Sequence, residues 1–132
     1  MVRFYHCNHS VLDIERSCAF YAEQFGLRVM RQLTAYEGAL RLAFLGNDAS
    51  DFRLELTWNR DRKTPYALGE KEFHVAFYTD SYDALLQKHK AAGIVVLDEP
   101  ELRLYFVEDP DGYRVEVVEL PARPGDRPDS LT

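Results

Sequence analysis

The chain has 132 residues, 46% hydrophobic and 29% charged, which is typical of a globular protein of about one domain. Its formal net charge of −6, without any cluster of Lys and Arg, argues against a nucleic-acid-binding protein. No apolar stretch approaches the roughly 20 residues of a membrane-spanning helix, and the N-terminal residues do not resemble a secretion signal. Cys7 and Cys18 are too few for a disulfide framework. We therefore expect a cytoplasmic protein without a membrane partner.

The first half of the chain predicts one helix among four strands. Residues 2–10 carry the aromatic and β-branched residues of a strand. Asp13 suits the N-cap of a helix whose apolar face ends at Gly26. Three further strands are predicted at 27–33, 39–45 and 52–58.

The second half repeats this order after a polar linker, residues 59–72. A strand is predicted at 73–79, and Asp80 or Ser81 caps a helix that ends at Gly93. The remaining strands are predicted at 94–97, 101–107 and 113–120, with a strong turn signal at residues 109–112. The tail, residues 121–132, has three prolines and little apolar content, so we expect it to be disordered.

Each half therefore reads as a β-α-β-β-β module, and the fold class is α+β. We expect a single domain over residues 1–120, with modules at about 2–58 and 73–120. Such an open four-stranded unit cannot close a barrel alone. Two modules side by side, within or between chains, would form a curved sheet around a cleft.

A repeated motif places one glutamate in each module. The run Leu-Arg-Leu-Ala-Phe-Leu at 40–45 returns as Leu-Arg-Leu-Tyr-Phe-Val at 102–107. Each copy leads into a strand with a central glutamate, Glu55 in the first half and Glu116 in the second. These two residues therefore occupy equivalent places in the two modules.

Each module also opens with a histidine in an apolar strand, His6 in the first and His74 in the second. Two neutral imidazoles and two carboxylates would form a charge-balanced site for a divalent cation, with two octahedral positions left open. Mixed nitrogen and oxygen ligation admits Zn, Ni, Co, Mn or Fe(II). The duplicated pattern predicts a metal site made from His6, Glu55, His74 and Glu116.

Taken singly, each of these residues has an ordinary structural explanation. A strand histidine is more often a core residue than a ligand, and a glutamate between apolar neighbours can lie on a solvated face. The recurrence in matching places favours a metal, because burying unpaired carboxylates costs several kcal/mol. His9 is expected on the strand face opposite His6, and His89 suits a helix C-terminus. Cys7 is expected to face away from His6 as a small buried hydrophobe.

Three segments resemble the vicinal oxygen chelate superfamily. Residues 106–116 resemble its DPDGY-x-[IV]-E signature, and Leu-Glu-Leu-Thr-Trp-Asn at 54–59 resembles its ELTxN motif. Asp13 to Tyr21 resembles the D-x-x-x-S-x-x-FY pattern of its first helix. Within the superfamily, a glutamate at position 55 resembles glyoxalase I (lactoylglutathione lyase) of the compact bacterial type. Other branches use only three metal ligands or have a glutamine at this place.

That resemblance implies a metal-dependent lyase, which converts the methylglyoxal–glutathione hemithioacetal to S-lactoylglutathione by proton transfer through a metal-bound enediolate. It implies that His6, Glu55, His74 and Glu116 are the metal ligands. Glu116 would be the principal base, Glu55 a second acid/base, and Asn59 a contact for the thiol. The implied metal is Ni(II) or Co(II), with Zn(II) possible, and the implied assembly is a homodimer with metal sites built from two chains.

The chain also departs from the family pattern. Ser10 and Glu70 stand where the family usually has arginines, and the lid before the last strand pair is shortened to residues 98–101. One alternative is therefore a related metal-dependent isomerase or lyase with a different thiol or acyl substrate. The other is a metal-free binding protein similar to the bleomycin-resistance modules. The sequence leaves open whether the site lies within one chain or across a dimer interface.

Overall fold

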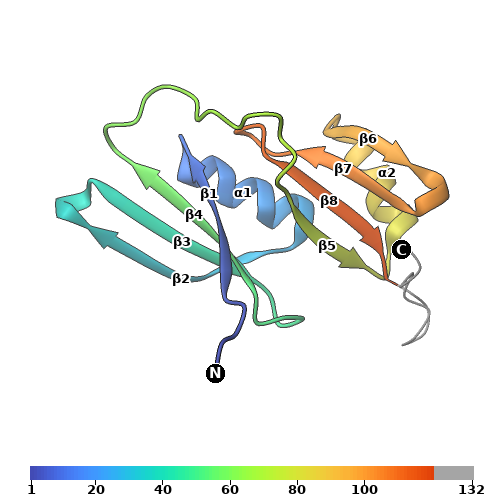
Figure 1. Cartoon of the computed structure of the whole chain (residues 1–132), viewed down its shortest axis with the longest axis horizontal. Helices are drawn as coiled ribbons and strands as arrows, with labels where there is room; N and C mark the ends of the chain where they lie inside the picture. The colour runs from blue at the N-terminus through green and yellow to red at the C-terminus, as the bar shows by residue number, and fades with distance from the viewer. Residues whose placement is uncertain (121–132) are drawn as a thin grey trace. The chain divides into compact units, whose positions relative to one another are not determined.

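The computed structural model describes residues 1–120, which form two compact units (Figure 1). The first comprises residues 1–72 and 109–113, and the described part of the second comprises residues 73–108 and 114–120. Each unit contains one four-stranded sheet and one α-helix, so the predicted α+β class with two β-α-β-β-β modules is confirmed. The predicted disordered tail, 121–132, lies outside the described residues.

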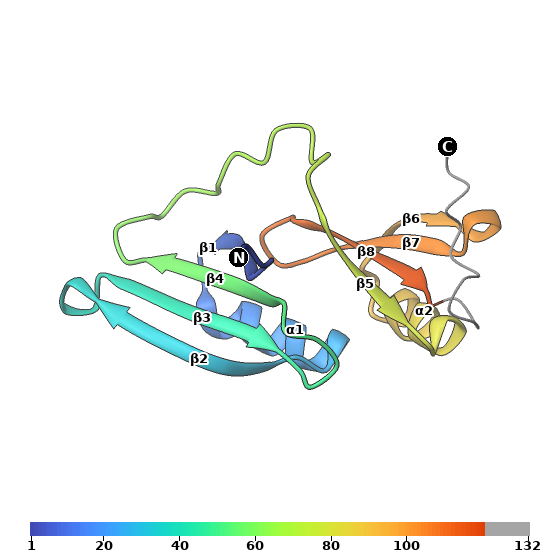
Figure 2. The ribbon, with the colours of Figure 1, turned by 60° about the horizontal axis from the view of Figure 1, so that its bottom comes forward.

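The sheet of the first unit has the strand order β1-β4-β3-β2. Its strands are β1 (His6–Val11), β2 (Arg28–Ala35), β3 (Leu40–Gly46) and β4 (Arg53–Asn59). β1 runs parallel to β4, and the other neighbours are antiparallel. A short 3₁₀ turn (Tyr36–Gly38) joins β2 to β3. Helix α1 (Ile14–Phe25) lies against one face of this sheet (Figure 2), which leaves the opposite face for other contacts.

Helix α1 begins and ends where the capping residues predict. The Asp13 side chain accepts a hydrogen bond from the backbone N–H of Arg16 at 3.0 Å. Gly26 closes the helix in the left-handed region at φ 66°, where a side chain would be strained. Ile14 and Tyr21 on the helix are buried, and so is Leu56 on the facing strand. Burial of these apolar side chains favours the packing of the helix on the sheet.

The second unit repeats the topology, with the strand order β5-β8-β7-β6. Its strands are β5 (Val75–Thr79), β6 (Val95–Glu99), β7 (Leu104–Glu108) and β8 (Arg114–Glu119), and its helix is α2 (Tyr82–Ala91). β5 is parallel to β8, as β1 is to β4. The core of this unit consists of Tyr82, Leu86, Tyr105, Val107, Val115 and Val117.

Several strands begin later than the sequence predicted. β1 starts at His6 rather than at residue 2, because its partner β4 starts only at Arg53, whose N–H donates to the carbonyl of Tyr5 at 3.0 Å. β5 likewise starts at Val75 rather than at 73. β7 starts at Leu104 rather than 101, because Pro100–Leu102 forms a 3₁₀ turn that ends with Arg103 at φ 53°.

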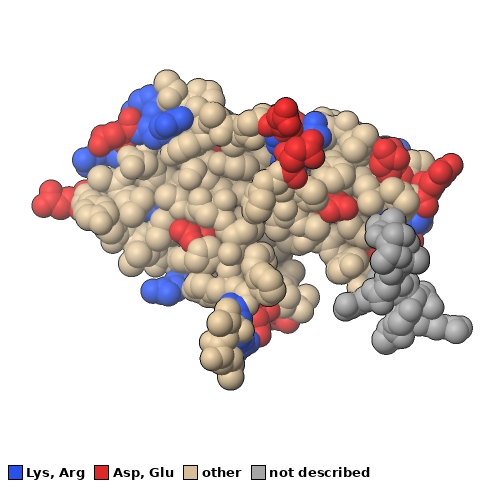
Figure 3. Space-filling model, viewed as in Figure 1, with Lys and Arg blue, Asp and Glu red and all other residues tan. Residues whose placement is uncertain are grey.

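No helix within the described residues is long and apolar enough to cross a membrane. On the face drawn in Figure 3, charged side chains occur in separate small groups among uncharged residues. The exposed ion pairs include Arg28 with Asp48 at 2.6 Å and Arg3 with Asp51 at 3.2 Å. Exposed pairs of this kind contribute little to stability.

Two buried tyrosines predict a loss of stability at alkaline pH. Burial raises the pKa of Tyr21 well above its ordinary value, and the neighbouring carboxylate of Asp109 raises it further. Burial also raises the pKa of Tyr105. In the unfolded chain both ionise near pH 10. A raised folded-state pKa gives stability that is complete below that pH and is lost as the pH rises towards the folded-state pKa.

We therefore expect the free energy of unfolding, measured with urea, to fall as the pH rises from about 10 to 11. In Tyr105→Phe this alkaline decline should be shallower, because one group that must stay protonated has been removed. An exposed tyrosine, Tyr36, provides the control, since Tyr36→Phe should keep the wild-type slope. Identical slopes in all three proteins would contradict the assignment.

Candidate metal centre

The first half-site consists of His6 and Glu55. His6 is the first residue of β1 and Glu55 is central in β4, where it pairs with Asn8. Since side chains two residues apart on a strand share a face, His6 and Glu55 lie on the same face of the sheet. The His6 Nε2 is 2.6 Å from the Glu55 Oε2. The ring of Phe44 packs edge-on to His6, with ring centroids 5.6 Å apart.

The second half-site consists of His74 and Glu116, in the same arrangement. His74 immediately precedes β5, and Glu116 of β8 pairs with Ala76, two residues further on. The His74 Nε2 is 3.0 Å from the Glu116 Oε2. The ring of Phe106 packs edge-on to His74 at 4.9 Å between centroids. Each half-site is thus a histidine, a glutamate and an aromatic ring on one sheet face.

Strand register confirms the internal repeat that the sequence predicted. Phe44 of β3 pairs with Glu55, and Phe106 of β7 pairs with Glu116. The structure therefore brings the four predicted ligands together as two pairs. Within residues 1–120, no group of three or more His, Cys, Asp or Glu side chains could hold a metal ion by itself.

The chemistry of each pair fits a divalent metal. An imidazole nitrogen and a carboxylate oxygen converge at each half-site, and both histidine side chains remain 33% exposed. Borderline divalent cations accept this mixture of nitrogen and oxygen ligands. If a pair were buried with every polar atom hydrogen-bonded, a metal could not reach its nitrogen and oxygen atoms. Each of these partly open pairs can offer one nitrogen and one oxygen to a metal.

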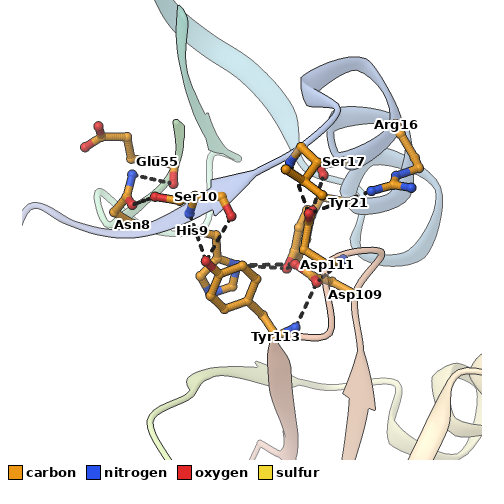
Figure 4. Close-up of polar contacts among 11 residues, drawn as sticks. Asn8, His9, Ser10, Arg16, Ser17, Tyr21, Glu55, Asp109, Asp111 and Tyr113 are labelled. Atoms are coloured by element: carbon orange, nitrogen blue, oxygen red, sulfur yellow. Dashed lines mark hydrogen bonds and ion pairs between the residues drawn. The ribbon is translucent and has the colours of Figure 1, made fainter. Parts of the chain in front are cut away.

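The two half-sites differ in what holds their carboxylates. The Thr57 hydroxyl donates to the Glu55 Oε1 at 3.2 Å, and the side-chain amide of Asn8 donates to the Thr57 hydroxyl. The same amide of Asn8 reaches the Glu55 carbonyl at 3.4 Å, and Figure 4 shows Asn8, Ser10 and Glu55 beside one another. Within the described chain, Glu116 receives no comparable hydrogen bond to its Oε1. Hydrogen bonds of this kind orient metal ligands.

The loop of residues 109–113 is bound to β1 and α1 by a network of hydrogen bonds (Figure 4). The Asp109 carboxylate accepts from the Tyr21 hydroxyl at 2.7 Å and from the N–H groups of Asp111 and Tyr113. The Tyr113 hydroxyl donates to the Ser10 carbonyl at 2.9 Å. The sequence marked these residues as a turn and a family signature, but not as this anchor to the first module.

The two histidines assigned outside the site have buried structural roles. His9 is fully buried, stacks on Tyr113 with ring centroids 4.1 Å apart, and lies 3.2 Å from the Tyr21 hydroxyl. His89 is also fully buried, and its Nδ1 is 3.0 Å from the Tyr105 hydroxyl. His89 lies in the last turn of α2, as predicted, but its side chain turns into the core rather than towards solvent.

Cys7 lies on the face opposite His6, as predicted, but it is half-buried rather than fully buried. Burial raises the pKa of its thiol, which keeps it protonated and unsuited to binding a metal. Asn59 is exposed at the end of β4, and its side-chain oxygen accepts from the N–H of Asp61 at 3.0 Å. Its predicted contact with a thiol substrate stays a prediction.

Comparisons with known proteins give a consistent result. A family model described as "Glyoxalase/Bleomycin resistance protein/Dioxygenase superfamily" matches residues 3–117. The chain is 34% identical to a lactoylglutathione lyase of Neisseria meningitidis, with 89% of this chain and 91% of that protein aligned. It is also 34% identical to one of Arabidopsis thaliana, but there it spans only 44% of the relative's length. Among solved structures, the trypanothione-dependent glyoxalase I of Leishmania major has a TM-score of 0.80 and 30% identity, and the alignment covers 90% of this chain and 87% of that one.

Proposed function

The chain belongs to the glyoxalase/bleomycin resistance protein/dioxygenase superfamily, and from this premise we propose that it is a metal-dependent lactoylglutathione lyase. Its substrate would be the hemithioacetal of methylglyoxal and glutathione, and its product S-lactoylglutathione. The observation that carries the proposal is the matched pair of half-sites, one histidine and one glutamate on each sheet. Relatives that bear this name align over nearly the whole chain.

His6, Glu55, His74 and Glu116 would hold the metal. Bound there, a divalent metal would supply Lewis-acid chemistry, which makes the C–H between two adjacent substrate oxygens easier to ionise. Ni(II) or Co(II) is the proposed metal, because the chain resembles the compact members of the family, and Zn(II) is the alternative. The partly exposed histidines leave room for a small substrate beside the glutamates.

Glu116 would carry the proton between the two substrate carbons. Within residues 1–120 Glu116 contacts His74 through its Oε2, which leaves its Oε1 open to accept a proton. Glu55 has one oxygen occupied by the Thr57 hydroxyl, which leaves it fewer positions at which to accept a proton. Glu55 would therefore orient the site and act as the second acid/base. Asn59 would contact the thiol part of the substrate.

We further propose a homodimer in which each metal site takes His6 and Glu55 from one chain and His74 and Glu116 from the partner. Each half-site presents only two ligands on an exposed sheet face, and closed symmetric dimers are the commonest assembly. Two free, protonated cysteines suit a reducing compartment, so we place the protein in the cytoplasm.

The dimer predicts complementation between two inactive variants. In sedimentation at micromolar concentration we expect a species of twice the 15.3 kDa of the chain. His6→Ala and His74→Ala should each be inactive alone. When the two variants are mixed and refolded together, one of the two sites in the heterodimer keeps all four ligands, so activity should return. A 15.3 kDa species, or no recovery on mixing, would contradict shared sites.

The direct test of the function is turnover of the methylglyoxal–glutathione hemithioacetal by the purified protein. The apoprotein should be inactive, and reconstitution with Ni(II) or Co(II) should give faster thioester formation than reconstitution with Zn(II). Deuterium from solvent in the lactoyl product would support proton transfer by a protein base. Highest activity with Zn(II) would overturn the metal assignment, and no activity with any of the three metals would overturn the function.

A further inference from the structure

We infer that Arg31 is a specificity-determining residue, which binds a carboxylate on the thiol part of the substrate. This inference rests on the proposed function and adds the charge of the substrate that the site selects. Arg31 belongs to β2, at the edge of the first sheet, and its side chain is exposed.

Strand register places Arg31 on the same sheet face as the first half-site. Arg31 pairs with Phe44, and Phe44 pairs with Glu55. Directly opposed residues project to the same face, so the three side chains form one row across the sheet. Neighbouring strands are about 4.8 Å apart, which puts the backbones of Arg31 and Glu55 roughly 10 Å apart.

A β-bulge is what turns Arg31 to this face. The pairing of β2 with β3 shifts between Val29 and Arg31, so that Met30 is the extra residue. With a regular register, Arg31 would pair one residue earlier on β3 and project towards α1 instead. Bulges re-aim side chains in this way and are frequent beside active sites.

The guanidinium of Arg31 is held in place but keeps its charge unpaired. Its central carbon lies 5.8 Å from the centroid of the Phe44 ring, and the same ring contacts His6. Phe44 thus links the cation to the half-site. In the described part of the chain, Arg31 makes no ion pair or hydrogen bond. By contrast, Arg53 on the same face donates to the carbonyls of Ser50 and Phe52.

The second module shows that this cation is not part of the metal-holding framework. The equivalent row there consists of Glu116, Phe106 and Leu97, with the same bulge between Val95 and Leu97. Leu97 therefore stands where the first module has Arg31. The two modules share the glutamate and the aromatic ring, but only the first has the arginine. This difference indicates that the arginine contacts one end of the substrate and that the other end has no equivalent contact.

The distance and charge define the class of ligand. An extended tripeptide spans roughly 10 Å, since each residue contributes about 3.3–3.6 Å. The Arg31 guanidinium lies over the Phe44 ring, between its own strand and Glu55. A thiol on the central residue of such a peptide, with its sulfur adduct beside Glu55, can therefore place a terminal carboxylate against Arg31. Arginine binds carboxylates by charge-assisted hydrogen bonds. The structure therefore favours an acidic, peptide-sized thiol over a small neutral one.

The test compares acidic and neutral thiols in Arg31→Met and in wild type. The substrates are the methylglyoxal hemithioacetals of glutathione and of glutathione diethyl ester, which lacks free carboxylates. In Arg31→Met we expect KM for the glutathione adduct to rise about tenfold at unchanged kcat, because one charged hydrogen bond to an exposed group is lost. KM for the ester adduct should not change, and Arg31→Lys should recover part of the loss. Arg28→Met removes a cation from the same strand and should match wild type.

Binding provides a readout that does not depend on turnover. In calorimetry, S-methylglutathione should bind wild type more tightly than its diethyl ester does, and Arg31→Met should abolish that difference. Equal weakening of acid and ester, or no effect on either, would overturn the role of Arg31 while leaving the lyase activity intact. If wild type turns over neither adduct, the proposed function fails. In that case the role of Arg31 is also contradicted if wild type binds S-methylglutathione no more tightly than its diethyl ester. If wild type binds the acid more tightly, the role of Arg31 stands without the lyase activity.

Discussion

Glu116→Gln should lower turnover of the hemithioacetal by a factor of about 10² to 10⁴, the usual cost of losing a general base. A carboxamide can still offer one oxygen to a metal, but it cannot accept a proton near neutral pH. Metal content should therefore fall much less than the rate, and excess Ni(II) should offset that fall. The measurements are kcat at saturating Ni(II) and solvent deuterium in the lactoyl product.

The matched variant is Glu55→Gln, which removes the equivalent carboxylate of the first module. Since Thr57 already holds one oxygen of Glu55, we expect the smaller loss of rate there. Glu101→Gln removes an exposed glutamate from the turn before β7 and serves as the charge control. If Glu116→Gln stayed near wild-type turnover while Glu55→Gln was inactive, the two carboxylates would have exchanged roles. Equal inactivity of every protein, wild type included, would point to a different substrate.

Removing both site histidines should abolish metal binding. Each half-site has one imidazole, so His6→Ala or His74→Ala alone leaves three of the four proposed ligands. We expect each single variant to bind Ni(II) on the order of 100-fold more weakly, at least as large a loss as changing a residue that supports a ligand. The double variant should hold no metal after gel filtration, as measured by elemental analysis.

His89→Gln is the control for losing a histidine. It lies in the core of the second module, against Tyr105. This change should lower the free energy of unfolding by about 1–3 kcal/mol, the cost of disturbing a buried hydrogen bond, while metal per folded chain stays constant. A full metal complement in the His6→Ala, His74→Ala double variant would contradict the four-ligand metal centre.

The repeat made much of the fold and of each half-site predictable. Two glutamates at the same place in a duplicated motif must occupy the same register when both copies fold alike, and Glu55 and Glu116 pair with Phe44 and Phe106. The start and end of α1 could be predicted because capping is local: Asp13 bonds three residues ahead and Gly26 supplies a left-handed residue.

What the sequence did not predict depends on contacts between distant residues. The contacts that surround His9 join distant parts of the chain. Tyr21 lies 12 residues from His9, and Asp109 lies 88 residues from Tyr21. The bulge at Met30 could not be predicted from the sequence, because the extra residue shifts the strand pairing but is not of a type that marks a bulge. Only the register places Arg31 on the same sheet face as Glu55.

Strand ends were mispredicted for a related reason. Val2 and Phe4 have the composition of a strand, but a strand needs a partner, and β4 offers none before Arg53. Arg103 gave no sign of its left-handed conformation, since that position most often takes glycine. Its side chain bonds Glu119 and Asp83 and lies 4.1 Å from the centre of the Tyr82 ring, contacts that stabilise the strained backbone.

X-ray absorption of the Ni(II)-loaded protein can show whether one metal takes a histidine and a glutamate from each module. The number of imidazoles around the metal can be counted from their characteristic scattering. We predict two in wild type and in His89→Gln, and one in the residual complex of either His6→Ala or His74→Ala. Two imidazoles per metal in either of those single variants, or none in wild type, would contradict a centre shared by the two modules.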